Sequence, residues 1–284
     1  IVLRLSAGDP ARLRAPVFAS PDVIEQYRRD FGTDQHIIVQ LTRFLWGAVR
    51  GDLGTSFRFQ EPVMDLVLVA LPRTLALAGC ALTLALGVTI ILGSLAALRP
   101  NSIWSALATV IATIGQSAPV FWTGALMVLF FSVRLDWLPS GGFTGVSSLA
   151  LPAVAVALSI IPTQMRVLRS SMSAVLKEDY IQTAHAFGLS ERRITFHYAL
   201  KNASLPLLTV IGVDIGYLLG GVIVAEVVFA FPGIGELALV ALNARDYPLV
   251  QGITIVTASI FVVVNLLIDL AYSRIDPRIR MEQS

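Results

Sequence analysis

Long apolar runs alternate with short polar connections through most of this 284-residue chain. A helix needs about 20 mostly apolar residues to cross a hydrocarbon core of roughly 30 Å. Five windows reach that length, at residues 74–98, 103–133, 149–168, 205–229 and 251–272. Their apolar residues do not alternate with polar ones, as they would in the strands of a membrane β-barrel. The pattern predicts an all-α integral membrane protein with five visible spans.

A polar interruption at residues 178–206 separates the third window from the fourth. Residues 179–187 favour a helix, and their acidic start complements the positive end of a helix dipole. Gly188 is suited to end that helix, because glycine adopts a positive φ without strain. Ser190 then begins a second helix that leads into the fourth span. The interruption therefore predicts a short helix, a turn and a second helix that another protein could contact.

Lys and Arg are retained on the cytoplasmic side of short connections, and this rule orients the chain. The connections predicted to lie outside hold Arg134 and Arg245. The interruption and the C-terminus are predicted to be cytoplasmic, and the long segment before the first span is predicted to lie outside. The basic residues that mark the cytoplasmic side are Arg166, Arg169, Lys177, Arg192, Arg193, Lys201, Arg274, Arg278 and Arg280.

The beginning of the sequence predicts an additional span. Residues 1–5 are apolar except for Arg4, and no initiator Met precedes them. Five spans and a cytoplasmic C-terminus place residue 1 on the outer side of the membrane. No targeting segment precedes residue 1 to bring it there. We therefore expect residues 1–5 to be the end of a first transmembrane helix. A cleaved signal peptide is the alternative.

The segment at residues 6–71 has helix signals of its own. Residues 8–10 indicate a turn, and a first helix is expected to start at Pro21 and to stop at Gly32. Residues 36–49 then place apolar side chains on one face of a second helix. The segment is either a cap over the membrane helices or a docking platform for an external partner, and the two interpretations are compatible.

Composition supports a membrane protein and argues against other classes of function. Hydrophobic residues make up 55% of the chain and charged residues 14%, against roughly 25% charged in soluble domains. A net charge of +2 gives no nucleic-acid signal. One cysteine and three widely separated histidines provide no disulfide framework and no metal-ligand cluster. No nucleophile motif indicates a catalytic residue.

The sequence also lacks a nucleotide-binding motif. A P-loop needs a lysine directly after glycine, but Lys177 and Lys201 both follow leucine. Residues 233–238 match a Gly-x-Gly-x-x-Ala fingerprint without the strand context and the acidic residue about 20 positions later that a dinucleotide site needs. The energy for any transport must come from a partner subunit or from an ion gradient.

Polar side chains inside the predicted spans are candidates for a substrate path. An Asp at a helix centre costs roughly 2.5–3.5 kcal/mol unless it is paired or faces water. Prolines in the second and third spans free backbone carbonyls beside polar side chains. Interhelical hydrogen bonds and simple shaping of the helices are the alternatives. The candidates are Gln116, Ser117, Gln164, Asp214 and Glu226.

Short motifs along the whole chain resemble one transporter family. The interruption contains Gln182-Thr183-Ala184, with Gly188 four residues after the alanine, and then Leu205-Pro206. The other motifs, in order, are Gly8-Asp9-Pro10, Gly51-Asp52-Leu53-Gly54, Leu71-Pro72-Arg73-Thr74, Trp137-Leu138-Pro139, Glu178-Asp179-Tyr180, Phe231-Pro232-Gly233-Ile234-Gly235, Arg245-Asp246-Tyr247-Pro248 and Asp276-Pro277-Arg278. Together they resemble the first permease subunit of binding-protein-dependent ABC importers of dipeptides and oligopeptides. The interruption departs from that family's Glu-Ala-Ala pattern at Gln182 and Thr183.

The resemblance implies a type I ABC importer transmembrane fold with six helices, in the cytoplasmic membrane of a prokaryote. Residues 6–71 would be extracytoplasmic, and residues 72–284 would form the permease core with a cytoplasmic coupling loop at about 170–204. The residues implied to contact an ATPase are Asp179, Tyr180, Thr183, Ala184, Phe187, Gly188, Leu189, Arg192 and Arg193.

The resemblance also implies a set of partners. They are a second homologous permease, two ATPase subunits that bind ATP and Mg, an external substrate-binding protein, a peptide and membrane lipid. This chain would hold no cofactor and would not be an enzyme by itself. Members with this pattern also handle nickel complexes and other small solutes.

Two other functions stay open from the residues alone. A secondary transporter would use Asp214, Glu226 and Asp269 to bind protons or sodium, although no internal repeat supports it. A membrane scaffold that transports nothing leaves the polar residues inside the spans unexplained.

Overall fold

The computed structural model describes residues 11–12, 15–16 and 18–275. These residues form α-helices with short 3-10 and π-helical segments, and their β structure is limited to an isolated bridge between Thr55 and Pro62. The predicted all-α architecture is confirmed. The helix end expected at residues 1–5, the turn at residues 8–10 and the motif at residues 276–278 lie outside the described residues.

The chain divides into two compact units, Ile1–Thr74 with Pro232–Ile260 and Leu75–Phe231 with Phe261–Ser284. Helices α5 (Val63–Val88) and α15 (Tyr247–Ile275) each contribute residues to both units. Each unit has a hydrophobic core of its own.

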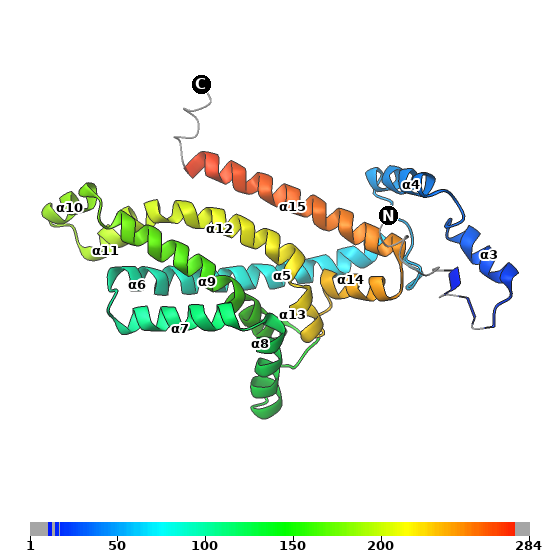
Figure 1. Ribbon diagram of the computed structural model, residues 1–284, viewed down its shortest axis with the longest axis horizontal. Helices are drawn as coiled ribbons and strands as arrows, with labels where there is room; N and C mark the ends of the chain where they lie inside the picture. Colours follow the sequence, from blue (N-terminus) through cyan, green and yellow to red (C-terminus); the bar gives the residue numbers. More distant parts are fainter. Residues whose placement is uncertain (1–10, 13–14, 17, 276–284) are drawn as a thin grey trace, which may run out of the picture. The chain divides into compact units, whose positions relative to one another are not determined.

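The first unit holds α3 (Pro21–Asp30), α4 (Ile37–Val49) and α14 (Ile234–Asn243) beside its parts of α5 and α15 (Figure 1). Helix α3 starts with proline at its first position, as predicted, and ends before Gly32, whose φ of 62° favours glycine. Helix α4 is capped by the side chain of His36. The core of this unit consists of Leu53, Val63, Val67, Ala70, Ile234, Ala241, Leu249 and Ile253.

The second unit is built around one central helix, α9, which packs against α6, α7, α8, α12 and α13 (Figure 1). Of the most apolar 18-residue stretch of α9, 61% is buried. Buried Ala153, Ala155 and Ala157 let the neighbouring helices approach closely. In chain order the unit contains η1 (Thr89–Gly93), α6 (Ser94–Leu98), α7 (Ile103–Ser117), α8 (Val120–Met127), η2 (Val128–Arg134), η3 (Val146–Leu149), α9 (Ala150–Val175), α10 (Asp179–Ala186), α11 (Glu191–Arg193), η4 (Ile194–Ala199), α12 (Leu200–Gly221) and α13 (Ile223–Val228).

Pro119 divides the second predicted span into two helices. Ala118 is extended, with φ of −97° and ψ of 120°, because a residue before proline avoids helical geometry. The helical segments on the two sides of this break are bent by 108°. The sequence predicted a single kinked span at residues 103–133, and the structure corrects this to a broken span or a re-entrant pair (Figure 1).

Among the described residues, three helices are long and apolar enough to cross a membrane: Val63–Leu98, Val146–Val175 and Tyr247–Ile268. The broken pair adds a fourth if it counts as one span. The first of these helices starts at Val63 instead of residue 74, because α5 accommodates Pro72 in its interior. The span predicted at residues 205–229 corresponds to α12 and α13, and it stays a prediction.

Candidate functional site

The connection between α9 and α12 folds into a compact projection, residues 178–199. Helix α10 ends at Ala186, and Gly188 follows it with φ of 72°. The backbone N–H groups of Gly188 and Leu189 donate to the carbonyl oxygens of His185 (2.9 Å) and Ala184 (3.2 Å). These bonds satisfy carbonyls of the last helical turn, which is the role predicted for a glycine stop.

The inner side of the projection is fixed to the helices that carry it. Ile181 and Ala184 of α10 are buried in the same core as Leu168 of α9 and Leu207 of α12. Asn202 at the start of α12 donates its side-chain N–H to the hydroxyl oxygen of Tyr180 (2.8 Å). The buried side chains of Ile181 and Ala184 and the hydrogen bond to Tyr180 therefore attach α10 to the core that it shares with α9 and α12.

The outer side of the projection is exposed. Phe187 is 81% exposed, and Tyr180 is 41% exposed although its hydroxyl accepts the hydrogen bond from Asn202. Ala184 is only 6% exposed and Leu189 is half-buried, so the structure places Ala184 on the fixed side and not among the exposed positions. The remaining residues expected to contact an ATPase are all exposed: Asp179, Thr183, Gly188, Arg192 and Arg193.

Two of the path candidates belong to a buried polar chain across three helical segments. Gln164 of α9 donates its Nε2 hydrogen to Oδ2 of Asp214 in α12 (2.7 Å). Thr89 in η1 donates its hydroxyl to Oε1 of Gln164 (3.3 Å). Thr89 and Gln164 are fully buried, and Asp214 is 7% exposed. The structure thus shows the interhelical hydrogen bond that the sequence left open for Asp214.

The other three path candidates have different surroundings. Gln116 and Ser117 are exposed at the end of α7, next to the break at Pro119. Arg166 of α9 donates Nη2–H to Oε1 of Gln116 (2.7 Å). Glu226 is fully buried in α13. Gln164 and Asp214 are therefore joined directly, whereas Gln116 is joined to an arginine.

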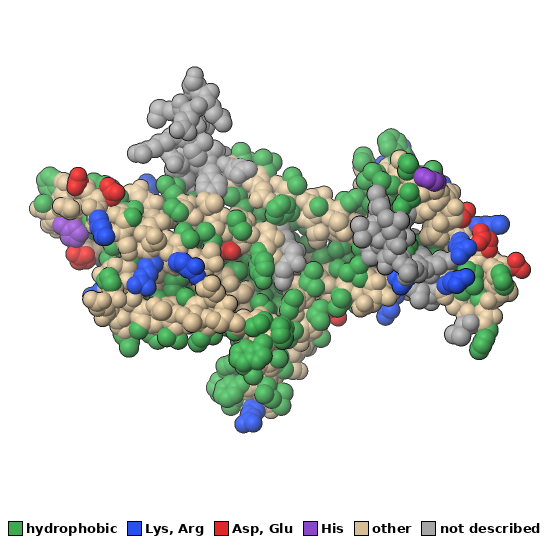
Figure 2. All heavy atoms as spheres, in the orientation of Figure 1, with side chains coloured by type: hydrophobic (Ala, Val, Ile, Leu, Met, Phe, Trp, Pro, Cys, Tyr) green, Lys and Arg blue, Asp and Glu red, His purple; other side chains and the backbone are tan. Residues whose placement is uncertain are grey.

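The groove beside Gln116 was not predicted from the sequence. It has a volume of about 420 Å³ and lies between α7 and α9, where Figure 2 shows a group of basic side chains. Arg166 and Arg169 line it, although the sequence used them only as markers of the cytoplasmic side. The sequence signal for the groove is the helical spacing of Arg166, Arg169, Ser170 and Ser173, which places these polar residues on one face of α9.

In the first unit, the buried Asp246 of the motif at residues 245–248 binds a loop that is far away in the chain. Asp246 accepts hydrogen bonds from the hydroxyl of Ser56 (2.5 Å) and from the backbone N–H groups of Arg58 (2.9 Å) and Leu249 (3.2 Å). The last of these caps the N-terminus of α15. Asp246 is fully buried, so it fixes the loop at residues 54–62 to the start of α15.

A second pair of motifs meets at the start of α14. The backbone N–H of Ile234 donates to the hydroxyl oxygen of Thr74 (2.8 Å), and Arg73 donates to the carbonyl oxygen of Pro232 (3.3 Å). The residues at 71–74 and 231–235 therefore act as one structural element. Their role in positioning α14 explains the polar residues of these motifs.

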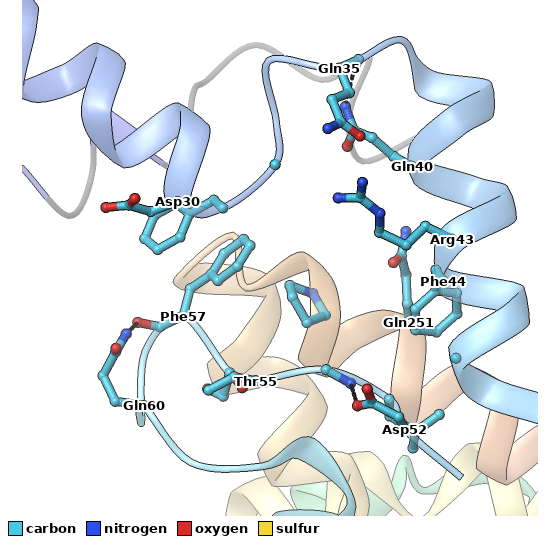
Figure 3. A pocket seen from close by; sticks show the side chains of 17 residues that line it. Asp30, Gln35, Gln40, Arg43, Phe44, Asp52, Thr55, Phe57, Gln60 and Gln251 are labelled. Carbon is cyan, nitrogen blue, oxygen red and sulfur yellow. Dashed lines mark hydrogen bonds between the residues drawn. The ribbon is translucent and has the colours of Figure 1, made fainter. Parts of the chain in front are cut away.

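The first unit also contains a pocket of about 470 Å³ between α4 and the loop that carries Phe57. Figure 3 shows Arg43 of α4 extending into it opposite Phe57, whose ring is stacked on Phe31 with 4.1 Å between centroids. Gln35 also lines the pocket, and its Oε1 is buried with no hydrogen-bond partner among the described residues. The pocket offers an aromatic surface together with one arginine, two aspartates and one buried amide oxygen.

Comparisons with known proteins agree with the motifs. Residues 89–281 match the family described as binding-protein-dependent transport system inner membrane component. The chain is 38% identical to a probable peptide ABC transporter permease protein of Sinorhizobium fredii, over 99% of this chain and 92% of the relative. It is also 38% identical to a probable D,D-dipeptide transport system permease protein of Escherichia coli, over 98% of this chain and 91% of the relative. The predicted resemblance is confirmed.

A solved structure supports the fold independently. An inward-facing structure of the MetNI methionine ABC transporter matches with a TM-score of 0.63 at 16% identity, covering 76% of this chain and 99% of the matched chain. At that identity the similarity shows the fold alone, which is the predicted transmembrane fold of an ABC importer subunit. The chain belongs to the family of binding-protein-dependent transport system inner membrane components.

Proposed function

We propose that this chain forms part of the transmembrane path of an ATP-driven peptide importer. The observation that carries the proposal is the projection at residues 178–199, which is fixed on its inner side and exposed on its outer side. A subunit of this kind needs a partner to supply energy, because its sequence has no P-loop. The relatives named as peptide and dipeptide permeases support peptides as the substrate.

The projection is suited to couple ATP hydrolysis to a change of access. Phe187 and Tyr180 would enter a cleft of an ATPase subunit, with Arg192 and Arg193 near acidic groups of that partner. When two ATPases close on ATP and Mg, two such projections would move together. Because Ile181 shares a core with residues of α9 and α12, this movement would tilt both helices and exchange an inward-open path for an outward-open one.

The proposed assembly contains a second homologous permease, two ATPases and an external substrate-binding protein. We place it in the cytoplasmic membrane of a prokaryote, with the projection and the C-terminus in the cytoplasm and residues 6–71 outside. The pocket that contains Arg43 is then the candidate contact for the external binding protein. A partner side chain inserted there would meet Arg43 and the stacked phenylalanines, together with the two aspartates of the pocket, Asp30 and Asp52.

The test is Phe187→Ala in the complete importer reconstituted in proteoliposomes. We expect ATP-driven peptide uptake to fall at least about tenfold, since a buried aromatic anchor contributes about 2 kcal/mol or more to an interface. The ATPase subunits should also dissociate more readily during purification. Phe18→Ala is the matched control, because Phe18 is 97% exposed in the segment placed outside.

Equal uptake by the Phe187→Ala complex and the wild type would contradict a coupling role for the projection. Uptake that continues without ATP in an imposed ion gradient would replace the importer with a secondary transporter.

A further inference from the structure

The groove between α7 and α9 presents a one-sided set of polar groups. Helix α9 contributes Arg166, Arg169, Ser170 and Ser173. Their spacing of three, four and seven residues places all four side chains on one face of the helix. Helix α7 faces them with Gln116 and with threonines at the same kind of spacing. The rest of the lining is apolar, with Ala108 and Ala112 from α7 and Pro162 and Met165 from α9, so the polar groups form a stripe beside the apolar contact of the two helices.

The groove contains two arginines, so its charge is positive. No Asp or Glu lines it, and within the described part of the chain no carboxylate forms an ion pair with Arg166 or Arg169. Arg166 donates to Oε1 of Gln116 (2.7 Å), which orients the guanidinium and leaves the Gln116 amide N–H groups available. The groove therefore has many hydrogen-bond donors and no carboxylate acceptor in its lining.

A guanidinium with no carboxylate beside it in a membrane-spanning helix has to face water or a charged ligand, because hydrocarbon would not solvate it. Arg166 lies nine residues before Val175, the last residue of α9, or roughly 14 Å at 1.5 Å per residue. It therefore stands in the half of α9 that leads to the projection. A movement of the projection would reach the groove through α9.

We propose that this groove binds the C-terminal carboxylate of the transported peptide on its way through the membrane, a proposal that rests on the importer function proposed above. The planar guanidinium groups match the two oxygens of a carboxylate, and the Gln116 amide adds a third donor. The phosphate of an anionic lipid has the same recognition chemistry. The two sources of the anion are separated by the experiment.

The experiment measures thiol reactivity in the groove of the complete importer in proteoliposomes. Thr113→Cys supplies the thiol in a Cys80→Ser background, since Cys80 is exposed and would otherwise react. The probes are a negatively charged sulfonatoethyl methanethiosulfonate and a positively charged trimethylammonioethyl methanethiosulfonate. We expect the negative reagent to react at least about tenfold faster than the positive one, because a cleft of one charge concentrates counter-ions.

The arginine variants test the cause of this preference. Arg166→Gln with Arg169→Gln should abolish it, while Arg166→Lys with Arg169→Lys should keep it, because lysine retains the charge. Arg99→Gln is the matched control, since Arg99 is an exposed arginine in the connection between α6 and α7 and does not line the groove. Should the double Gln variant fail to assemble, Arg169→Gln alone should halve the preference or more.

Protection by ligands identifies the source of the anion. Trialanine with a free carboxylate should slow the reaction, and trialanine with a C-terminal amide should not. Reaction with neither reagent, equal rates for both reagents, or equal protection by both peptides would overturn the proposal. The reaction could instead be slower in vesicles of phosphatidylglycerol than in vesicles of phosphatidylcholine, while the free-acid peptide gives no protection. That result would assign the groove to a lipid phosphate and would overturn the peptide as its ligand.

ATP-driven uptake of free-acid trialanine in the same vesicles separates this inference from the proposed function. Uptake without any charge preference at the Thr113→Cys thiol would overturn the groove proposal and leave the importer in place. If the charge preference is intact but no peptide is taken up, the anion that the groove binds is not the carboxylate of a transported peptide.

Discussion

The two units each bury an aspartate, and they satisfy it in different ways. Asp246 of the first unit accepts three hydrogen bonds, two of them from backbone N–H groups. Asp214 of the second unit accepts one among the described residues, from the side chain of Gln164. Backbone donors are fixed by the fold, whereas a side-chain donor can rotate away. Asp246 is therefore held mainly by the backbone, whereas the bond of Asp214 depends on the rotamer of one side chain.

The largest effect is expected for Asp246→Ala. This change removes the acceptor of the buried Ser56 hydroxyl, the buried backbone N–H of Leu249 and the partly buried backbone N–H of Arg58. Since each unsatisfied buried group costs about 1–3 kcal/mol, we expect a loss of at least about 3 kcal/mol of folding stability. The measurement is the thermal unfolding midpoint of the purified importer in detergent.

Asp52→Ala is the control for that change. Asp52 is exposed and accepts one hydrogen bond, from the backbone N–H of Gly54 (2.9 Å), so the expected loss is about 1 kcal/mol or less. Equal shifts of the midpoint for the two variants would mean that Asp246 is no more important to the fold than a surface turn.

An intermediate effect is expected for Gln164→Leu, which conserves volume but removes both hydrogen bonds of the central glutamine. Asp214 and Thr89 would lose their partner, with a cost of about 2–3 kcal/mol. Gln116→Leu is the control, because Gln116 is exposed at the end of α7. An unchanged unfolding midpoint in the Gln164→Leu protein would show that the polar chain does not hold η1, α9 and α12 together.

The smallest effect is expected for Asp214→Asn. The carbonyl oxygen of an asparagine can still accept from Gln164, so stability should change by less than about 1 kcal/mol. The same exchange at Asp246 turns one acceptor oxygen into a donor that faces other donors, and it should be clearly destabilising. Comparable midpoints for the two Asn variants would remove the distinction between the two aspartates.

The helix bounds near turn residues could be predicted because the signals are local. The predicted helix at residues 179–187 and its stop at Gly188 agree with α10 (Asp179–Ala186) and with the positive φ of that glycine. The start of α3 at Pro21 follows from the same kind of signal. A cap, a fixed φ or a glycine stop depends on a few neighbouring residues, and the sequence shows all of them.

The geometry of the second predicted span was not available from the sequence. Proline at position 119 indicated a kink, but a kink and a bend of 108° have the same local sequence. Before this break α7 lies very close to α9, since a Cβ at Gly115 would collide with the carbonyl oxygen of Leu158. Packing against another helix is a long-range effect, and hydrophobic periodicity contains no information on it.

The sequence by itself determined that this chain is a helical membrane protein, where most of its helices lie and which family it belongs to, because length, hydropathy and local motifs carry that information. Only the tertiary structure decided which distant residues meet: Ser56 with Asp246, Thr74 with the start of α14, Gln164 with Asp214, and Arg166 with Gln116. Each of these contacts joins segments separated by at least 50 positions. Their partners are chosen by how apolar faces pack, and that choice depends on the whole chain at once.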